Sequence, residues 1–238
     1  VFVTGCNRGI GLGLTRQLLS DPSVSIVIAT ARDIDSAKDL KSLQNPKLHI
    51  ITLDVSYEES IAQASESVSE IVGENGLDIL INNAGIGFMA PLNEYVSKKR
   101  IVEVFEVNTI APLLIANKFY PLLKKAVSKK GSAQIANISS SMGSLENSSQ
   151  LGMDMALAVY DMSKTALNML TRRLAVEWKD DNIRATSFCP GWVKTDMGTQ
   201  AAQFTVEEST ISLVKLILSL TDDHNGQFLN HTGERIPW

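Results

Sequence analysis

The sequence lacks the features that mark several broad protein classes. No apolar run approaches the ~20 residues that a membrane-spanning helix requires. The 22 basic and 26 acidic residues form no long run of like charge, which argues against a nucleic-acid-binding surface. Only two cysteines, Cys6 and Cys189, are present, without metal-ligand spacing, as is typical of a reduced intracellular protein. We therefore expect a cytoplasmic protein that binds no metal, membrane or nucleic acid.

No signal peptide, repeat, low-complexity tract or dividing linker is visible either. The chain enters a strand pattern directly at Val1-Phe2-Val3, so we expect a few N-terminal residues to be missing from the sequence. With 238 residues, 44% of them hydrophobic, one domain with a substantial core is expected over residues 1–238.

Short apolar segments alternate with amphipathic segments along the whole chain. The apolar segments are hydrophobic throughout, which is typical of parallel strands covered on both faces. This alternation predicts a doubly wound, Rossmann-type α/β fold, a parallel sheet of seven strands with its ligand at their carboxyl ends. The predicted strands are 1–4, 24–30, 48–54, 77–82, 134–139, 184–188 and 226–230, and the predicted helices are 9–20, 36–43, 57–73, 98–126, 159–178 and 205–220.

A glycine-rich turn, Thr4-Gly5-Cys6-Asn7-Arg8-Gly9-Ile10-Gly11, joins the first predicted strand to the first predicted helix. Gly5 allows the tight turn, and Gly9 lets the backbone approach a pyrophosphate, whose charge the helix N-terminus attracts. The turn therefore predicts a dinucleotide site. The residues expected to bind the cofactor here are Gly5, Asn7, Arg8, Gly9 and Ile10.

Polar motifs follow other predicted strands at the same edge of the sheet. The asparagines of Asn82-Asn83-Ala84-Gly85 could brace the glycine turn and line the ribose, or only cap a turn of their own. The serines after Ile138 could bond a substrate oxygen or form an ordinary turn, and Thr195 could meet a nicotinamide carboxamide. The further residues expected to bind the cofactor are Arg32, Asp54, Val55, Asn82, Ala84, Gly85, Pro190, Gly191, Val193 and Thr195.

Tyr160 and Lys164 stand four residues apart in a predicted helix, so they share one face. The ordinary tyrosine pKa of ~10 is too high for proton transfer at neutral pH, and a cation one turn away would lower it. Beside a dinucleotide site, the pair predicts an acid/base tyrosine, although a buried tyrosine beside a solvated lysine has the same spacing. Asn108 lies between apolar neighbours in the predicted helix 98–126, where either a buried or an exposed position is possible.

Together, TGCNRGIG, NNAG, Asn108, the S-x-x-G of Ser140–Gly143, Y-x-x-x-K and PGWVKT resemble the classical short-chain dehydrogenase/reductase family in order and spacing. ATARD, PGWVKTDMG, TVEES and NGQFLNHTGERIPW also resemble its sniffer-type carbonyl reductase branch. The resemblance covers the whole chain and implies the strand order 3-2-1-4-5-6-7. It also implies a catalytic tetrad of Asn108, Ser140, Tyr160 and Lys164.

The implied activity is carbonyl reduction with a nicotinamide cofactor. Ser140 and Tyr160 would bind the carbonyl oxygen, and Tyr160 would donate the proton. Lys164 would lower the Tyr160 pKa and bind the nicotinamide ribose. Tyr160 would also contact the cofactor. Asn108 would anchor a water that returns the proton.

Two long polar segments, 143–157 and 191–204, are expected to form the walls or lid of the substrate pocket. Ser140 and Tyr160 are 20 positions apart, several more than in compact family members, and the extra residues fall in 146–154. Shortening that segment is expected to change substrate preference more than NADPH affinity. An apolar, Met-rich pocket would suit a small hydrophobic aldehyde or ketone. Its expected walls are Phe88, Met89, Met142, Leu145, Trp192 and Met197.

The sequence also predicts the cofactor. Enzymes of this architecture that prefer NAD carry an acidic residue about 20 positions after the glycine turn. Ala31 stands there instead, followed by Arg32, and Arg8 lies in the turn itself. Two guanidinium groups favour a 2′-phosphate, so we expect NADPH/NADP+. Asp33 could pair with Arg32, but we expect it to cap the next helix.

Two other functions stay open. A redox sensor could hold a dinucleotide without turnover, but it would not need both Tyr160 and Lys164. A methyltransferase could bind S-adenosylmethionine at the glycine turn, but the arginines would have no role. Family relatives also imply a homodimer through helices 98–126 and 159–178, whose apolar positions exceed one sheet-facing stripe.

Overall fold

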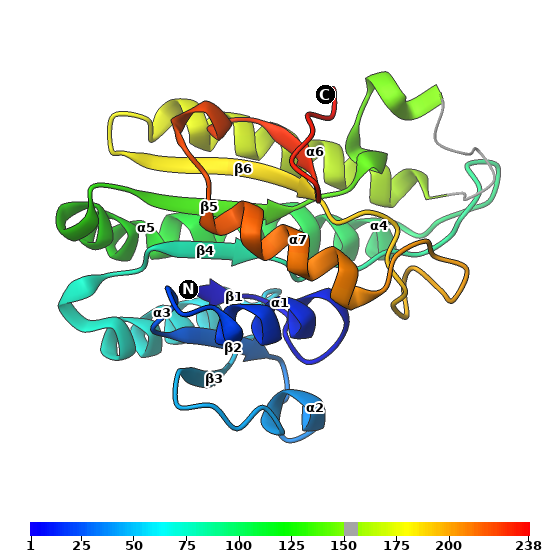
Figure 1. The fold of residues 1–238 in the computed structure, drawn as a ribbon. Coiled ribbons are helices and arrows are strands. Elements are labelled where there is room, and N and C mark those ends of the chain that lie inside the picture. The colour runs from blue at the N-terminus through cyan, green and yellow to red at the C-terminus, as the bar shows by residue number, and fades with distance from the viewer. Residues whose placement is uncertain (150–156) are drawn as a thin grey trace.

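The computed structural model describes residues 1–149 and 157–238 and contains one seven-stranded parallel sheet between two layers of helices (Figure 1). Its strand order is β3-β2-β1-β4-β5-β6-β7, which confirms the predicted fold class and order. The strands are β1 (Phe2–Val3), β2 (Val27–Ala31), β3 (Leu48–Thr52), β4 (Ile79–Asn82), β5 (Ala133–Ile138), β6 (Ile183–Cys189) and β7 (Phe228–Asn230).

The strand order reverses at β1, which pairs with β2 on one side and β4 on the other. Loops that leave the carboxyl ends of β1 and β4 therefore separate to opposite faces of the sheet and leave a crevice between them. This reversal places the glycine turn, which follows β1, beside the Asn-Asn-Ala-Gly segment, which follows β4.

Helices cover both faces of the sheet, as Figure 1 shows. Phe2 and Val3 are adjacent in β1, so their side chains point to opposite faces. Phe2 packs in the core under α3, α5 and α6, with its ring centroid 4.7 Å from that of Phe119, whereas Val3 packs in the core under α1 and α7. The helices are α1 (Gly9–Ser20), α2 (Lys38–Lys41), α3 (Glu58–Val72), α4 (Lys98–Phe105), α5 (Ala111–Lys130), α6 (Ala158–Glu177) and α7 (Val206–Leu218).

The predicted helix 98–126 is interrupted, because a five-residue π-helical segment, Glu106–Ile110, joins α4 to α5. Such wide turns often occur at functional sites. The predicted helix 36–43 is also reduced to the single turn of α2. Over residues 1–149 and 157–238, no helix combines the length and apolar character needed to cross a membrane.

Candidate active site

A cleft of about 460 Å³ opens at the carboxyl ends of the strands. The glycine turn, the ends of β2, β3 and β4, the start of α6 and the loop after β6 line it. Most of the predicted cofactor residues lie here: Gly5, Asn7, Arg8, Gly9, Ile10, Arg32, Asp54, Val55, Ala84, Gly85, Tyr160, Lys164, Pro190 and Thr195.

The glycine turn is packed too closely for side chains. Gly5 and Gly9 have φ angles of +71° and +56°, a region that glycine adopts readily. A methyl group on Gly11 would lie 2.1 Å from the carbonyl oxygen of Gly5 and 2.5 Å from Nδ2 of Asn83. The turn then delivers the chain into α1, whose first residues carry no acidic side chain and no side-chain cap at Arg8. The first N–H groups of α1 therefore have the partial positive charge that binds an anion.

The two asparagines after β4 have different roles. Asn83 braces the glycine turn, because its Nδ2 donates to the carbonyl oxygens of Thr4 (2.8 Å) and Gly5 (3.1 Å). Asn82 is only 3% exposed and donates through Nδ2 to Oδ1 of Asn137 on β5 (2.8 Å). The Asn82 side chain therefore points away from the cleft lining, and the expected contact of Asn82 with the cofactor stays a prediction.

The partner of Asn82 belongs to a buried polar network that sequence reasoning missed. Asn137 donates to Oγ1 of Thr171 on α6 (2.8 Å), and the hydroxyl of Ser187 on β6 donates to the same oxygen (2.8 Å). The network fixes α6 against three strands, and α6 carries Tyr160 and Lys164. Its one signal in the sequence is the pair of polar residues, Asn137 and Ser187, inside apolar strands.

Lys164 is buried, with 4% of its surface exposed, and its Nζ donates to the carbonyl oxygen of Ile138 at the end of β5 (2.9 Å). Burial lowers the pKa of Lys164 to about 8, so the amine is mostly protonated at pH 7. Its Nζ lies 5.6 Å from the centroid of the Tyr160 ring. The structure therefore excludes the alternative of a solvated lysine.

Burial raises the pKa of the Tyr160 phenol above its ordinary value, while the nearby Ser140 hydroxyl acts in the opposite direction. The expected lowering of this pKa by Lys164 is not found, because the loss of hydration outweighs the other influences. The phenol consequently holds its proton at neutral pH.

The three serines after β5 are directed differently. The hydroxyl of Ser139 donates to the backbone carbonyl oxygen of Lys164 (3.4 Å). Ser140 instead faces Tyr160, and its hydroxyl accepts a bond from the backbone N–H of Met142 (3.2 Å). This arrangement agrees with the choice of Ser140 from the S-x-x-G pattern.

Asn108 lies in the π-helical segment and is completely buried. Its Oδ1 accepts from the N–H of Ile86 (2.9 Å), while its Nδ2 donates to the Ile86 carbonyl (2.8 Å) and to Oγ of Ser163 (2.9 Å). Asn108 thus joins the loop after β4 to α6, next to the catalytic candidates, and is not an exposed helical residue. Its water-anchoring role stays a prediction.

The loop after β6 lines the cleft with only some of its predicted residues. Pro190 and Thr195 reach the cleft, whereas Val193 is 4% exposed and bridges to Phe204. Gly191 serves a turn, with φ +82° and the Phe204 ring 2.8 Å from the site of a Cβ. The turn at Gly191 therefore packs these two residues against Phe204, outside the described cleft lining, and their expected contacts with the cofactor stay a prediction. Gly11 of the glycine turn and Asn83, which was expected to brace that turn, also line the cleft. Cleft residues that the prediction missed are Leu53, Ser56, Ile86, Val107, Ile138, Ser139, Lys194, Asp196, Gln200 and Val206.

Arg32 lines the cleft just after β2, whereas Ala31 is 2% exposed and belongs to the core under α1. The Asp33 carboxylate accepts from the backbone N–H groups of Asp35 (2.9 Å) and Ser36 (3.4 Å). It therefore closes the turn before α2, whose N-cap residue Ala37 makes no side-chain cap, so the expectation that Asp33 caps this helix is wrong.

The expected substrate walls are only partly assembled around Tyr160. A methyl group at Gly87 would lie 3.0 Å from Cδ2 of Tyr160 and 3.6 Å from the sulfur of Met197, which lines the cleft. Phe88 instead packs under the guanidinium group of Arg100, 4.4 Å from the ring centroid. Met89, Leu145 and Trp192 are exposed and Met142 is half-buried. The segment 146–154, predicted to shape the rim, falls largely outside the described residues.

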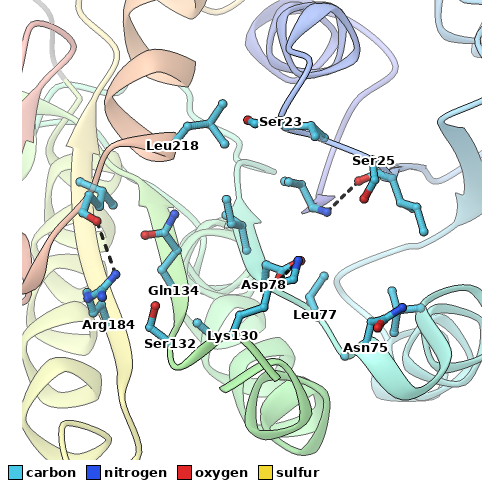
Figure 2. A pocket seen from close by; sticks show the side chains of 18 residues that line it. Ser23, Ser25, Asn75, Leu77, Asp78, Lys130, Ser132, Gln134, Arg184 and Leu218 are labelled. Carbon is cyan, nitrogen blue, oxygen red and sulfur yellow. Dashed lines mark hydrogen bonds and ion pairs between the residues drawn. The ribbon is translucent and has the colours of Figure 1, made fainter. Parts of the chain in front are cut away.

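A second cavity, of about 370 Å³, lies at the amino-terminal ends of the strands, away from the cleft. Figure 2 shows its lining, with the ion pair between Lys130 and Asp78 (2.9 Å) and the bond from Arg184 to the Leu220 carbonyl (3.4 Å). Among the described residues that line it, none is a predicted site residue. The first cleft is therefore the candidate active site.

Comparisons with known proteins agree with this geometry. The family model for short chain dehydrogenase matches residues 1–205. The carbonyl reductase Sniffer of D. melanogaster superposes with a TM-score of 0.94 and 34% identity, covering 100% of this chain and 98% of that one. An NADPH-bound carbonyl reductase from chicken fatty liver superposes with a TM-score of 0.92 and is 39% identical, again covering 100% of this chain and 98% of that one. The short-chain dehydrogenase srdF of Neurospora crassa is 33% identical over 255 residues, 100% of this chain and 97% of its own length.

Replacing Gly11 with alanine tests the glycine turn. The added methyl group would meet the Gly5 carbonyl oxygen at 2.1 Å, so the turn must open and lose its shape. We expect dinucleotide affinity to fall by at least tenfold, measured by titration calorimetry. Ser20→Ala, at the exposed far end of α1, is the matched control and should bind normally. Unchanged affinity in Gly11→Ala would contradict the assignment.

Proposed function

Because the chain belongs to the short-chain dehydrogenase family, we propose that it is an NADPH-dependent carbonyl reductase. The observation that carries the proposal is the meeting of Tyr160 and Lys164 with the glycine turn in one cleft. A dinucleotide fits the residues present, since the glycines leave room for it and the uncapped start of α1 offers N–H groups to its phosphates. When bound, NADPH would supply a hydride.

In the proposed reaction, Ser140 and Tyr160 hold the substrate oxygen, and Tyr160 gives it a proton. The raised pKa of Tyr160 suits this role, because the phenol is protonated and ready to donate at neutral pH. As the proton leaves, the protonated amine of Lys164, whose Nζ lies 5.6 Å from the centroid of the Tyr160 ring, stabilises the phenolate. The bond from Lys164 to the Ile138 carbonyl keeps the amine in place during this change.

The substrate we propose is a small hydrophobic aldehyde or ketone. Gly87 lies against Tyr160, Met197 lies close to Gly87, and both offer an apolar surface to the group next to the carbonyl. Two of the similar solved structures are named carbonyl reductases. A redox sensor remains the second candidate, but binding alone gives no reason to bury a protonatable lysine beside a tyrosine.

NADPH is preferred over NADH in this proposal because Arg8 and Arg32 both line the cleft and can bond a 2′-phosphate. The chicken relative is named as NADPH-bound. We also propose a cytoplasmic location, which the sequence alone suggests.

Tyr160→Phe tests the proton donor. Since general acid catalysis contributes roughly 10²–10⁴-fold, we expect carbonyl reduction to slow by at least a hundredfold while NADPH affinity persists. Tyr57→Phe, on the exposed start of α3, is the control. The loss of NADPH absorbance with a panel of aldehydes and ketones measures the reduction rate of both variants. A Tyr160→Phe variant that keeps more than a tenth of wild-type turnover would refute the role.

Arg32→Ala tests the cofactor preference. Loss of a charge-assisted hydrogen bond should weaken NADPH binding by about 10–100-fold, with little change for NADH, which lacks the 2′-phosphate. Arg16→Ala, on the exposed side of α1, removes the same charge outside the cleft. It should change the affinity for neither NADPH nor NADH. Equal wild-type efficiency with both cofactors would argue against the preference.

We propose that two chains associate through α4, α5 and α6, whose outer faces expose apolar side chains. Met169→Glu would place a charge in that contact and should give a monomer by light scattering at micromolar concentration, while Tyr57→Glu should stay dimeric. A monomeric wild type would exclude the dimer. The exposed apolar residues are Val102, Ile110, Leu113, Met162, Met169 and Val176.

A further inference from the structure

Arg8 of the glycine turn is held by a carboxylate from the opposite wall of the cleft. Its Nη1 lies 2.8 Å from Oδ2 of Asp196, in the loop after β6, and the two side chains are 69% and 74% exposed. Both residues line the cleft. The same two segments touch beside the pair, since a Cβ on Gly9 would lie 3.3 Å from Cγ2 of Thr195. The pair therefore spans the cleft between its two halves.

Asp196 is one of only two acidic residues in the described lining of the cleft. Arg32, Lys164 and Lys194 are the other basic residues of the described cleft lining, and Asp54 is the other acidic one. Asp54 is already engaged, because its Oδ1 accepts from the N–H of Ser56 (3.0 Å). Asp196 is thus the carboxylate that neutralises Arg8.

We propose that Asp196 is a specificity-determining residue that competes with the cofactor 2′-phosphate for Arg8. The inference rests on the proposed function. A guanidinium bound to Asp196 must leave that partner before it can bond a phosphate. The free energy needed to break the ion pair therefore reduces the affinity for NADPH. NADH, without the 2′-phosphate, leaves the pair intact. Asp196 therefore reduces the preference for NADPH over NADH that Arg8 and Arg32 create.

The size of the effect follows from the exposure of the pair. Exposed ion pairs are weak, and a competition of this strength changes an equilibrium by about fivefold at most. Salt screens the pair further, so the effect should be larger at low ionic strength.

Asp196 can be changed without disturbing its loop. Three contacts that do not use its side chain hold the loop: the bridge between Val193 and Phe204, the bond from Trp192 Nε1 to the Gly198 carbonyl (2.8 Å), and the bond from the Gly198 N–H to Oγ1 of Thr195 (3.1 Å). Asn at position 196 has nearly the same shape as Asp. The variant Asp196→Asn therefore removes the charge and keeps the geometry.

The test is a double-mutant cycle on the dissociation constants of NADPH and NADH, measured by calorimetry at low salt. Asp196→Asn should tighten NADPH binding two- to fivefold and leave NADH within twofold of wild type. In an Arg8→Ala background, Asp196→Asn should no longer change NADPH affinity. Asp223→Asn, an exposed change of the same charge outside the cleft, is the control. Thermal unfolding checks that each variant folds.

Each of the following results would overturn the inference. Equal tightening of both cofactors, or tightening that persists without Arg8, would mean that Asp196 acts by general charge and not through Arg8. Weaker binding of NADPH would mean that the pair closes over the cofactor instead of competing with it. A wild type that binds neither dinucleotide would refute the proposed function as well. Wild-type NADPH binding with an unresponsive Asp196→Asn would refute only the present inference.

Discussion

The bond from the buried ammonium of Lys164 to the carbonyl of Ile138 anchors the part of α6 that carries Tyr160 and Lys164. It fixes the second turn of α6 at the carboxyl end of β5. The close fit there leaves no alternative position, since a Cβ on Gly143 would lie 2.8 Å from the Lys164 carbonyl carbon and one on Gly85 would lie 3.5 Å from Nζ. Tyr160, one turn earlier, is placed by the same contacts. A cation desolvated to this extent is costly, so its bond to a carbonyl is what makes its burial tolerable.

The buried polar network supports this placement two turns further along the same face of α6. Thr171 receives hydrogen bonds from side chains on β5 and β6, and Asn108 reaches Ser163 from the helix on the other side. Hydrogen bonds are directional, so they define where α6 lies along the strands, whereas apolar packing alone would tolerate a small shift. The site thus depends on polar groups that lie outside the described lining of the cleft.

The sequence predicted the sheet and its order well, because parallel strands covered on both faces are apolar throughout and the glycine turn marks the first crossover. It was less successful at strand ends. Whether Asn82 or Asn83 faces the cleft depends on where β4 leaves the sheet, and the directions of Gly191 and Val193 depend on contacts with the distant Phe204. The pKa of Tyr160 likewise reflects burial, which spacing along a helix does not reveal.

The π-helical segment has a consequence for the phase of the helix that contains it. In a regular α-helix each residue turns the side chains by about 100°, so one wide turn offsets the faces before and after it by roughly that angle. Val104, before the segment, is buried, whereas Ile110, its last residue, and Leu113, just after it, are 46% and 39% exposed. Because of this offset, the continuous helical stretch of α4, the π-helical segment and α5 places one apolar stripe in the core and exposes a second one to solvent. The same offset directs the amide of Asn108 toward α6.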